Sequence, residues 1–457
     1  MEFDVAEIID RHHFGAFQLR IVILCALVQF FEGFDALMLA YTAPALSKTW
    51  HIAHRDLGPV FAASLAGMSI GTVVLSPLAD WFGRKRLLII SVLLFGGLTL
   101  VASQAQDVRQ LSMLRFVIGF GLAAAVPSTF VLVNEFAPRR YRATMVMCMA
   151  IGVAVGAATG GQLAALLVPS IGWRGMFVIG GVAPLVLLPF LLAWLPESVR
   201  FLIVKGGRTD QVIATLKRLD PSASYPPNAR FNLHHRPQPK GIRVGELFTQ
   251  GRLPVTACLW LAFVLSLIVL NFMNNWLPSV LATTGLPQAQ ALRIGTLFQI
   301  GGMIGIPIMG FLSDRFGYFR VLGATLVLQA FFVALIGWSE GSVPLLVVAV
   351  PMVGCCVIGV NNALMALAVT LYPTAIRATG SSWAHGFGRF GGIFGPIIGG
   401  ILLSQHWSLQ QVFAVGALFP LCNLLVVMTM AWCHARAQLH APVEPEMAQP
   451  LQYKGHG

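Results

Sequence analysis

The chain has 457 residues, of which 56% are hydrophobic and only 11% are charged. A soluble domain carries about 25% charged residues, so this composition excludes an ordinary soluble protein and indicates many membrane-spanning segments. The formal net charge of +12 would suit a nucleic-acid-binding protein, but the basic residues gather on one side of the predicted spans. We therefore expect a lipid bilayer around the protein and no nucleic-acid partner.

Twelve apolar stretches are each about long enough for an α-helix to cross the hydrocarbon layer, which needs roughly 18 residues or more. Six precede and six follow a polar segment. We therefore expect an all-α integral membrane protein with a six-helix bundle at 1–195, a loop at 196–252, a second six-helix bundle at 253–435 and a tail at 436–457. The predicted spans lie near 21–43, 57–79, 87–105, 111–135, 143–168, 175–195, 254–282, 291–312, 320–338, 343–371, 379–403 and 409–433.

The Lys and Arg residues predict the orientation of these spans. Most lie on the side that holds both termini and the central loop, which the positive-inside rule places in the cytoplasm. Met1–Arg20 has no apolar core and does not have the pattern of a cleavable signal peptide. The basic residues in loops on the opposite side are Lys48, Arg55, Arg109, Arg174 and Arg293.

The polar segments predict little chemistry of their own. The loop is amphipathic as far as Arg218, and Pro221–Gly241 is rich in Pro, Asn and His, so we expect a poorly ordered tether there. The tail from Ala441 lacks an apolar face and is expected to be disordered. All seven cysteines fall in apolar runs without metal-ligand spacing, which favours core packing over a metal or redox site.

A charged motif occurs twice, once in each half. Asp80–Arg86 (DWFGRKR) and Asp314–Arg320 (DRFGYFR) both separate apolar runs, and Arg142 and Arg377 follow them by 62 and 63 residues. Two equivalent membrane-embedded halves are typical of secondary transporters. We expect a latch between helix ends that forms in one conformation and breaks in the other, with a solvated turn as the alternative. Its candidates are Asp80, Gly83, Arg84, Glu135, Arg142, Asp314, Gly317 and Arg377.

Four ionisable residues lie inside apolar runs, where each costs at least about 2.5–3.5 kcal/mol. Glu32 and Asp35 share one helix face, and Arg115 and Arg389 reach a similar depth near the middle of the membrane. Two neighbouring carboxylates repel each other, which favours proton uptake by one of them. A guanidinium binds a carboxylate through two hydrogen bonds. We expect proton coupling at the acids and substrate binding at the arginines, with a structural Asp35–Arg115 pair as the alternative.

Further polar residues interrupt the apolar runs of the second half. They are expected to bind substrate, and hydrogen bonding between helices is the alternative for each. His385 precedes Arg389 by one helical turn, so a proton-relay role is also conceivable. The expected substrate-binding residues besides the arginines are His385, Asn271, Asn275, Trp276 and Asn362, and Asn274, Gln299 and Asn361 are further polar residues of these runs.

The repeated loops resemble the signature loop of the major facilitator superfamily and its second-half copy. Within that superfamily, the chain resembles the aromatic acid/proton symporter family over about residues 10–435. The residues that carry this second resemblance are Glu32–Asp35 (EGFD), Arg115–Gly121 (RFVIGFG), Asn134–Arg142 (NEFAPRRYR), Arg377–Gly380 (RATG) and Gly388–Gly391 (GRFG).

This resemblance implies the major facilitator fold, with two pseudo-symmetric bundles that rock against each other. It also implies import of aromatic carboxylates, such as hydroxybenzoates, with protons across a bacterial inner membrane. The proton is then the coupling ion, no other cofactor is expected, and a monomer is the default. Glu32 departs from the Asp that the family usually has, and Ser76 stands where the superfamily loop usually has Gly.

Other functions stay open at this point. A carrier of other small organic anions or a drug/proton antiporter would use the same fold, although a cation exporter would be expected to carry an excess of acids in its cavity. A membrane enzyme is disfavoured because no catalytic or phosphate-binding motif occurs. A sensor is disfavoured because the tail after Ala441 is short.

Overall fold

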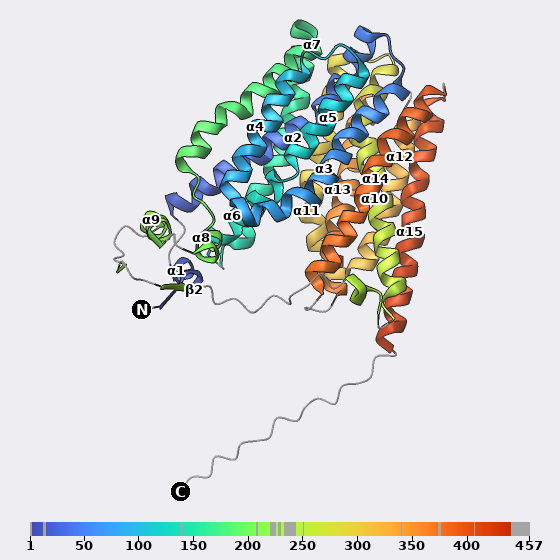
Figure 1. Cartoon of the computed structure of the whole chain (residues 1–457). Helices are drawn as coiled ribbons and strands as arrows, with labels where there is room; N and C mark the ends of the chain where they lie inside the picture. Colours follow the sequence, from blue (N-terminus) through green and yellow to red (C-terminus); the bar gives the residue numbers. More distant parts are fainter. Residues whose placement is uncertain are drawn as a thin grey trace.

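The computed structural model describes residues 2–11, 15–138, 140–206, 209–219, 225–226, 230–232, 244–249, 251–339, 341–372, 376–405 and 407–439. Long helices dominate it (Figure 1). The first set is α2 (Ala16–Trp50), α3 (His54–Phe82), α4 (Arg84–Ala102), α5 (Val108–Leu122), α6 (Ala125–Phe136) and α7 (Arg142–Trp194). The second set is α10 (Leu253–Thr283), α11 (Gln288–Phe316), α12 (Tyr318–Gly337), α13 (Val343–Leu371), α14 (Arg377–Ser404) and α15 (Leu409–Leu439).

All twelve predicted apolar runs lie on these helices. Among the described residues, ten helical segments are long and apolar enough to cross a membrane. One of them, within α7, contains two predicted runs. The backbone between these runs leaves the helical conformation at Gly172, where φ is +68°. α3 carries the run at 57–79, and the run at 111–135 is divided between the consecutive helices α5 and α6. The arrangement fits the expected twelve-helix fold.

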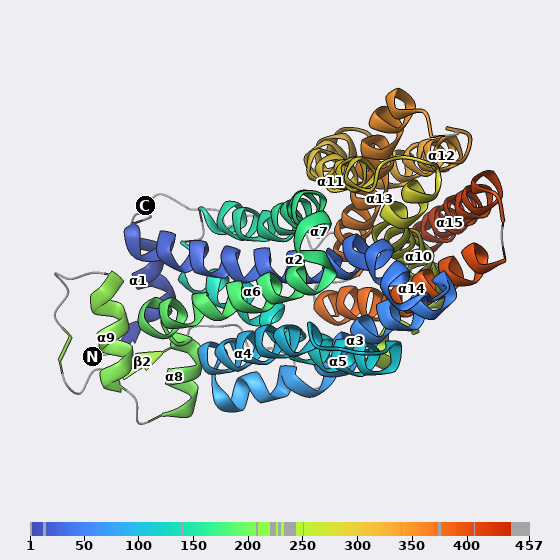
Figure 2. The same ribbon diagram turned by 90° about the horizontal axis from the view of Figure 1, so that it is seen from above.

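The helices pack as two groups, which lie beside each other in Figure 2. In the first group α2 packs on α7, α3 on α5, and α4 on both α5 and α7. In the second group α10 packs on α14, α11 on α13, and α12 on α15. Contacts between the groups run from α3 to α14, from α7 to α11 and from α2 to α10.

Glycines allow equivalent helix pairs to approach closely in the two groups. A Cβ on Gly67 of α3 or on Gly119 of α5 would lie 1.9 and 2.0 Å from backbone oxygens of the partner helix. A Cβ on Gly301 of α11 or on Gly354 of α13 would lie 1.9 Å from such an oxygen in both cases. Only glycine permits this spacing, so the internal repeat of the sequence extends to helix packing.

A small assembly lies beyond the ends of the first group, on the side of the molecule where the chain begins (Figure 1). It contains β1 (Glu2–Asp4), α1 (Val5–Arg11), α8 (Val199–Lys205), α9 (Thr209–Leu219) and β2 (Arg230–Asn232), and the 3-10 helix η1 (Val244–Leu247) follows. β1 pairs with β2 in parallel. The expectation of an unstructured tether is wrong at these residues, because Phe3, Tyr225 and Phe231 pack their rings together. Residues 221–224, 227–229, 233–243 and the tail from 440 lie outside the described residues.

Candidate functional site

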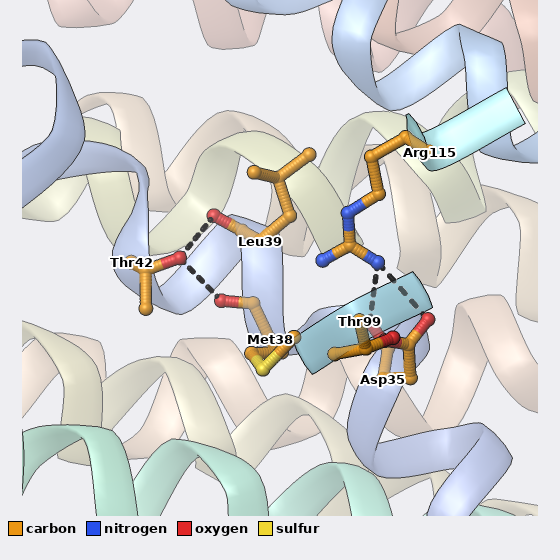
Figure 3. A network of polar contacts seen from close by, with 6 residues as sticks. All are labelled: Asp35, Met38, Leu39, Thr42, Thr99 and Arg115. Carbon is orange, nitrogen blue, oxygen red and sulfur yellow. Dashed lines mark hydrogen bonds and ion pairs between the residues drawn. The ribbon is translucent and has the colours of Figure 1, made fainter. Parts of the chain in front are cut away.

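Asp35 and Arg115 form a buried ion pair in the first group of helices. Arg115 Nη1 lies 2.9 Å from Asp35 Oδ2, and each residue is only 1% exposed. Thr99 Oγ1 of α4 donates to the other carboxylate oxygen, Oδ1, at 3.1 Å. Figure 3 shows these three side chains together, from α2, α4 and α5. The structure therefore contains the Asp35–Arg115 ion pair that the sequence offered as the alternative to separate functional roles.

The surroundings of Arg115 enclose it completely. Its guanidinium lies 5.0 Å from the ring centroid of Phe177, a buried residue of α7. Its Nε and Nη2 are buried without a hydrogen-bond partner among the described residues. An ion pair of this kind is strongly destabilised when one partner is removed, because the other charge stays buried and unpaired. The geometry suits a structural role for this pair within the first group.

Arg389 on α14 has a different environment. Its Nη1 donates to Thr72 Oγ1 at 2.7 Å and to the carbonyl of Met68 at 3.4 Å, both on α3. The side chain is half-buried. Its Nε and Nη2 have no partner among the described residues and are not enclosed. One edge of the guanidinium therefore stays free, and its N–H groups can donate to both oxygens of a carboxylate.

Glu32 and Arg389 lie close enough to interact electrostatically across the boundary between the two groups. The guanidinium of Arg389 and the carboxylate of Asp35 both act electrostatically on Glu32. Glu32 is half-buried, one helical turn before the buried Asp35. The two predicted acids therefore have different partners: Asp35 pairs inside the first group, and Glu32 interacts electrostatically with a cation of the second.

The asparagines and the tryptophan of α10 use their side-chain N–H groups mainly in hydrogen bonds within α10 and to a neighbouring helix. Asn271 Nδ2 donates to the backbone carbonyl of Leu267, and Asn275 Nδ2 donates to the backbone carbonyl of Asn271. The fully buried Trp276 uses its Nε1 in a 2.8 Å hydrogen bond to the carbonyl of Pro396. Since Trp276 has a single donor and it is occupied, this residue serves helix packing in this conformation.

The remaining predicted binding residues, Asn362 and His385, lie on α13 and α14, and Asn274 is a further polar residue of α10. Asn362 is exposed, and its amide donates to Ile358 in its own helix. Asn274 of α10 accepts a 2.8 Å hydrogen bond from Gln299 of α11. His385 is half-buried and packs edge-on against the ring of Phe263. Of these residues, His385 is next to Arg389.

The repeated loops have the same backbone geometry in both halves. Gly83 has φ of +97° and Gly317 has φ of +84°, and each separates two consecutive long helices. This left-handed region favours glycine. Asp314 is exposed. The side chains of Asp80 and Arg377 lie outside the described residues, so their expected pairing stays a prediction.

A cluster of polar residues at the end of the first group next to α8 includes the other latch candidates, which are Arg84, Glu135 and Arg142. Ser198 Oγ donates to Glu135 Oε1 at 2.9 Å, and the guanidinium groups of Arg84 and Arg200 attract this carboxylate. Arg142 Nη2 donates to the carbonyl of Ala137 at 3.2 Å. The Ser198–Glu135 hydrogen bond joins the start of α8 to the end of α6, and the Arg142–Ala137 hydrogen bond joins the start of α7 to the same end of α6.

Sequence reasoning missed Glu197 in this cluster. Its Oε1 accepts from the backbone N–H of Lys85 at 2.9 Å, so a carboxylate from the loop caps the first turn of α4. A Cβ on Gly83 would lie 2.5 Å from Glu197 Oε2. The sequence signal that could have identified Glu197 is the Glu197-Ser198 pair, which comes directly after the sixth predicted span. Thr72 and Thr99 were also missed, because single threonines in apolar runs give no signal.

No group of three or more His, Cys, Asp or Glu residues is arranged to hold a metal ion in the described part of the chain. The polar residues that meet at the boundary between the groups are instead an acid, a guanidinium and an imidazole. Such a set can bind an organic anion and exchange a proton.

The sequence matches the family model of the Major Facilitator Superfamily over residues 25–295 and 259–452. It is 38% identical to a 4-hydroxybenzoate transporter of Pseudomonas putida, over 90% of this chain and 91% of that protein. It is 36% identical to a gallate transporter of Pseudomonas putida, over 95% and 96% of the two chains. The crystal structure of a D-xylose–proton symporter has a similar fold, with a TM-score of 0.70 at 16% identity over 91% of this chain and 97% of the symporter.

Proposed function

We propose that this chain, which belongs to the major facilitator superfamily of membrane transporters, imports aromatic carboxylates of the hydroxybenzoate class together with protons. It is a multi-pass membrane transporter and not an enzyme, since it is similar to transporters along nearly its whole length. The observation that carries the proposal is the free edge of Arg389, a residue that also interacts electrostatically with Glu32 across the boundary between the two groups.

Arg389 is the residue that we expect to bind the substrate carboxylate. Both arginines have the required chemistry, but Arg115 is only 1% exposed and its charge is already paired with Asp35. Arg389 is half-buried and uses one nitrogen on α3. A carboxylate can therefore approach Arg389 without breaking an existing ion pair. In this proposal the Asp35–Arg115 pair stabilises the first group.

Glu32 is the residue that we expect to carry the proton. A carboxylate on Arg389 brings a second negative charge toward Glu32, and two negative charges at such a site repel each other. Protonation of Glu32 removes this repulsion, so proton and substrate bind together more readily than either binds alone. An inward proton gains roughly 2.3 kcal/mol per 100 mV of membrane potential, which can drive accumulation.

Alternating access follows from the way the two groups meet. Gln162 Nε2 donates to Thr296 Oγ1 at 2.8 Å, and Phe61 packs edge-on against Trp276. These contacts join the groups in the part of the helices far from the two termini. With the termini in the cytoplasm, this arrangement corresponds to a carrier that is closed toward the outside.

The remaining properties belong to the same proposal. We expect both termini to lie in the cytoplasm of a bacterial cell, with the chain in the inner membrane. We expect it to work as a monomer, with no nucleic-acid partner and no cofactor other than the coupled proton.

Uptake of radiolabelled aromatic acids into cells that express the protein tests this function. The panel contains 4-hydroxybenzoate, gallate, benzoate and a non-aromatic carboxylate, each measured with and without a protonophore. Uptake of a hydroxybenzoate that collapses with the protonophore is expected. With the protein present in the membrane, preferential uptake of the non-aromatic acid would favour a general organic-anion carrier instead.

A further inference from the structure

His385 and Arg389 lie four residues apart on α14, so their side chains leave the same face of the helix. The guanidinium acts electrostatically on the imidazole. The buried ring of Phe263, on α10, packs edge-on against His385, with 5.8 Å between ring centroids and an interplanar angle of 88°. The imidazole is therefore held in place one helical turn before Arg389.

The two nitrogens of this imidazole have different environments. Nδ1 is buried and has no hydrogen-bond partner among the described residues, whereas Nε2 is not enclosed. A neutral imidazole carries its proton on one nitrogen only. Burying an unpaired N–H is costly, which favours a bare Nδ1 and a proton on Nε2. His385 then presents an N–H donor on its open edge.

The close approach of neighbouring helices varies along α14: among the described residues nothing lies within 4 Å of a Cβ on Gly386, whereas a Cβ on Gly388 would lie 2.9 Å from Phe263. One turn beyond Arg389, Asn271 Nδ2 lies only 3.2 Å from the place of a Cβ on Gly392, so α10 closes against the helix there. One turn before Arg389 lies His385. We expect a flat ligand whose carboxylate is on Arg389 to extend away from Gly392, along the face of α14 that carries His385.

We propose that His385 determines specificity, by donating a hydrogen bond from Nε2 to a hydroxyl group opposite the substrate carboxyl group. The inference rests on the proposed function. The two polar ends of such a benzoate are one aromatic ring apart, which matches the rise of about 6 Å from residue i to i+4 of a helix. A benzoate without this hydroxyl leaves the donor unpaired, and a site built around a hydrogen bond rejects such an analogue.

Competition against uptake of labelled 4-hydroxybenzoate by the unmodified protein gives the first test. We expect unlabelled benzoate and 3-hydroxybenzoate to inhibit at least about tenfold more weakly than unlabelled 4-hydroxybenzoate, as for the loss of one hydrogen bond of about 1.4 kcal/mol. Equal inhibition by the three acids overturns the inference. Absence of uptake of every aromatic acid rejects the proposed function, and this inference with it.

Two substitutions at His385 give the second test. His385→Leu removes the donor and should raise KM for 4-hydroxybenzoate about tenfold, while the inhibition constant of benzoate stays unchanged. His385→Gln places an amide nitrogen near the position of Nε2 and should keep most of the discrimination, so it decides the question if the leucine variant does not fold. His434→Leu, on α15 beside Phe319, is the histidine control. Intact uptake with unchanged discrimination in His385→Leu overturns this inference and leaves the proposed function in place.

Discussion

Arg389 Nη1 lies 2.7 Å from Thr72 Oγ1, so the residue that we expect to bind substrate also joins the second group of helices to the first. A ligand that changes this hydrogen bond acts directly on the boundary between the groups. Substrate binding and the relative position of the two groups can be linked in this way, because a packed boundary has a small number of alternative arrangements.

Replacing Arg389 by Lys tests the carboxylate-binding edge. The variant keeps the charge but loses the two parallel N–H groups, so KM for 4-hydroxybenzoate should rise about tenfold or more. Kinetics of initial uptake measure this. Arg320→Lys, on the exposed start of α12, is the matched control and should keep the original KM. An unchanged KM in Arg389→Lys would exclude this arginine as the binding residue.

Replacing Glu32 by Gln tests the proton carrier. Glutamine resembles the protonated carboxyl group and cannot release a proton, so the variant should lose accumulation of substrate against its gradient. Exchange of internal for external substrate needs no net proton movement and should persist. Glu7→Gln, at an exposed ion pair with Arg11, is the control. Accumulation that survives in Glu32→Gln would assign coupling to another group.

Replacing Asp35 by Asn tests whether the Asp35–Arg115 pair is structural. The variant leaves the guanidinium buried without its counter-charge, and we expect a loss of stability of about 3–5 kcal/mol. Thermal unfolding of the purified protein in detergent measures it. The double variant Asp35→Asn with Arg115→Met removes the unpaired charge and should recover much of the loss. A single variant as stable as the original protein would contradict a structural pair.

The two loop glycines form a matched pair for substitution by alanine. Both have positive φ, so each substitution strains the backbone by roughly 1 kcal/mol. At Gly83 the added Cβ would also lie 2.5 Å from Glu197 Oε2, whereas no described residue lies within 4 Å of a Cβ at Gly317. Gly83→Ala should therefore unfold at a lower temperature than Gly317→Ala. The opposite order would show that the Glu197 contact does not constrain the first loop.

The helices could be predicted from the sequence because a bilayer imposes length and apolarity on each span. The repeated Asp80–Arg86 and Asp314–Arg320 motifs also predicted the two-fold plan, and both loop glycines have the same backbone conformation. The separate runs at 143–168 and 175–195 predicted the division of α7 near Gly172, but the division of the fourth run into α5 and α6 was not predicted. Local backbone breaks of this kind leave hydropathy unchanged.

The candidate site could be predicted only in part. The sequence brings Glu32, Asp35, Arg115 and Arg389 to similar depths, but it does not show which guanidinium is enclosed. That difference comes from Phe177 on one side and Thr72 on the other, and both are placed by tertiary packing. The pairing of β1 with β2 was also inaccessible, since these strands lie at opposite ends of the first half of the chain.

The most direct test of the account uses the purified protein in liposomes with an imposed pH gradient, acidic outside. Labelled 4-hydroxybenzoate is added outside, and its accumulation is followed with and without a protonophore. Proton-coupled import predicts accumulation above the external concentration that disappears when the protonophore is added. Transport that only equalises the two concentrations, whether or not the gradient is present, would contradict proton-coupled import of aromatic acids.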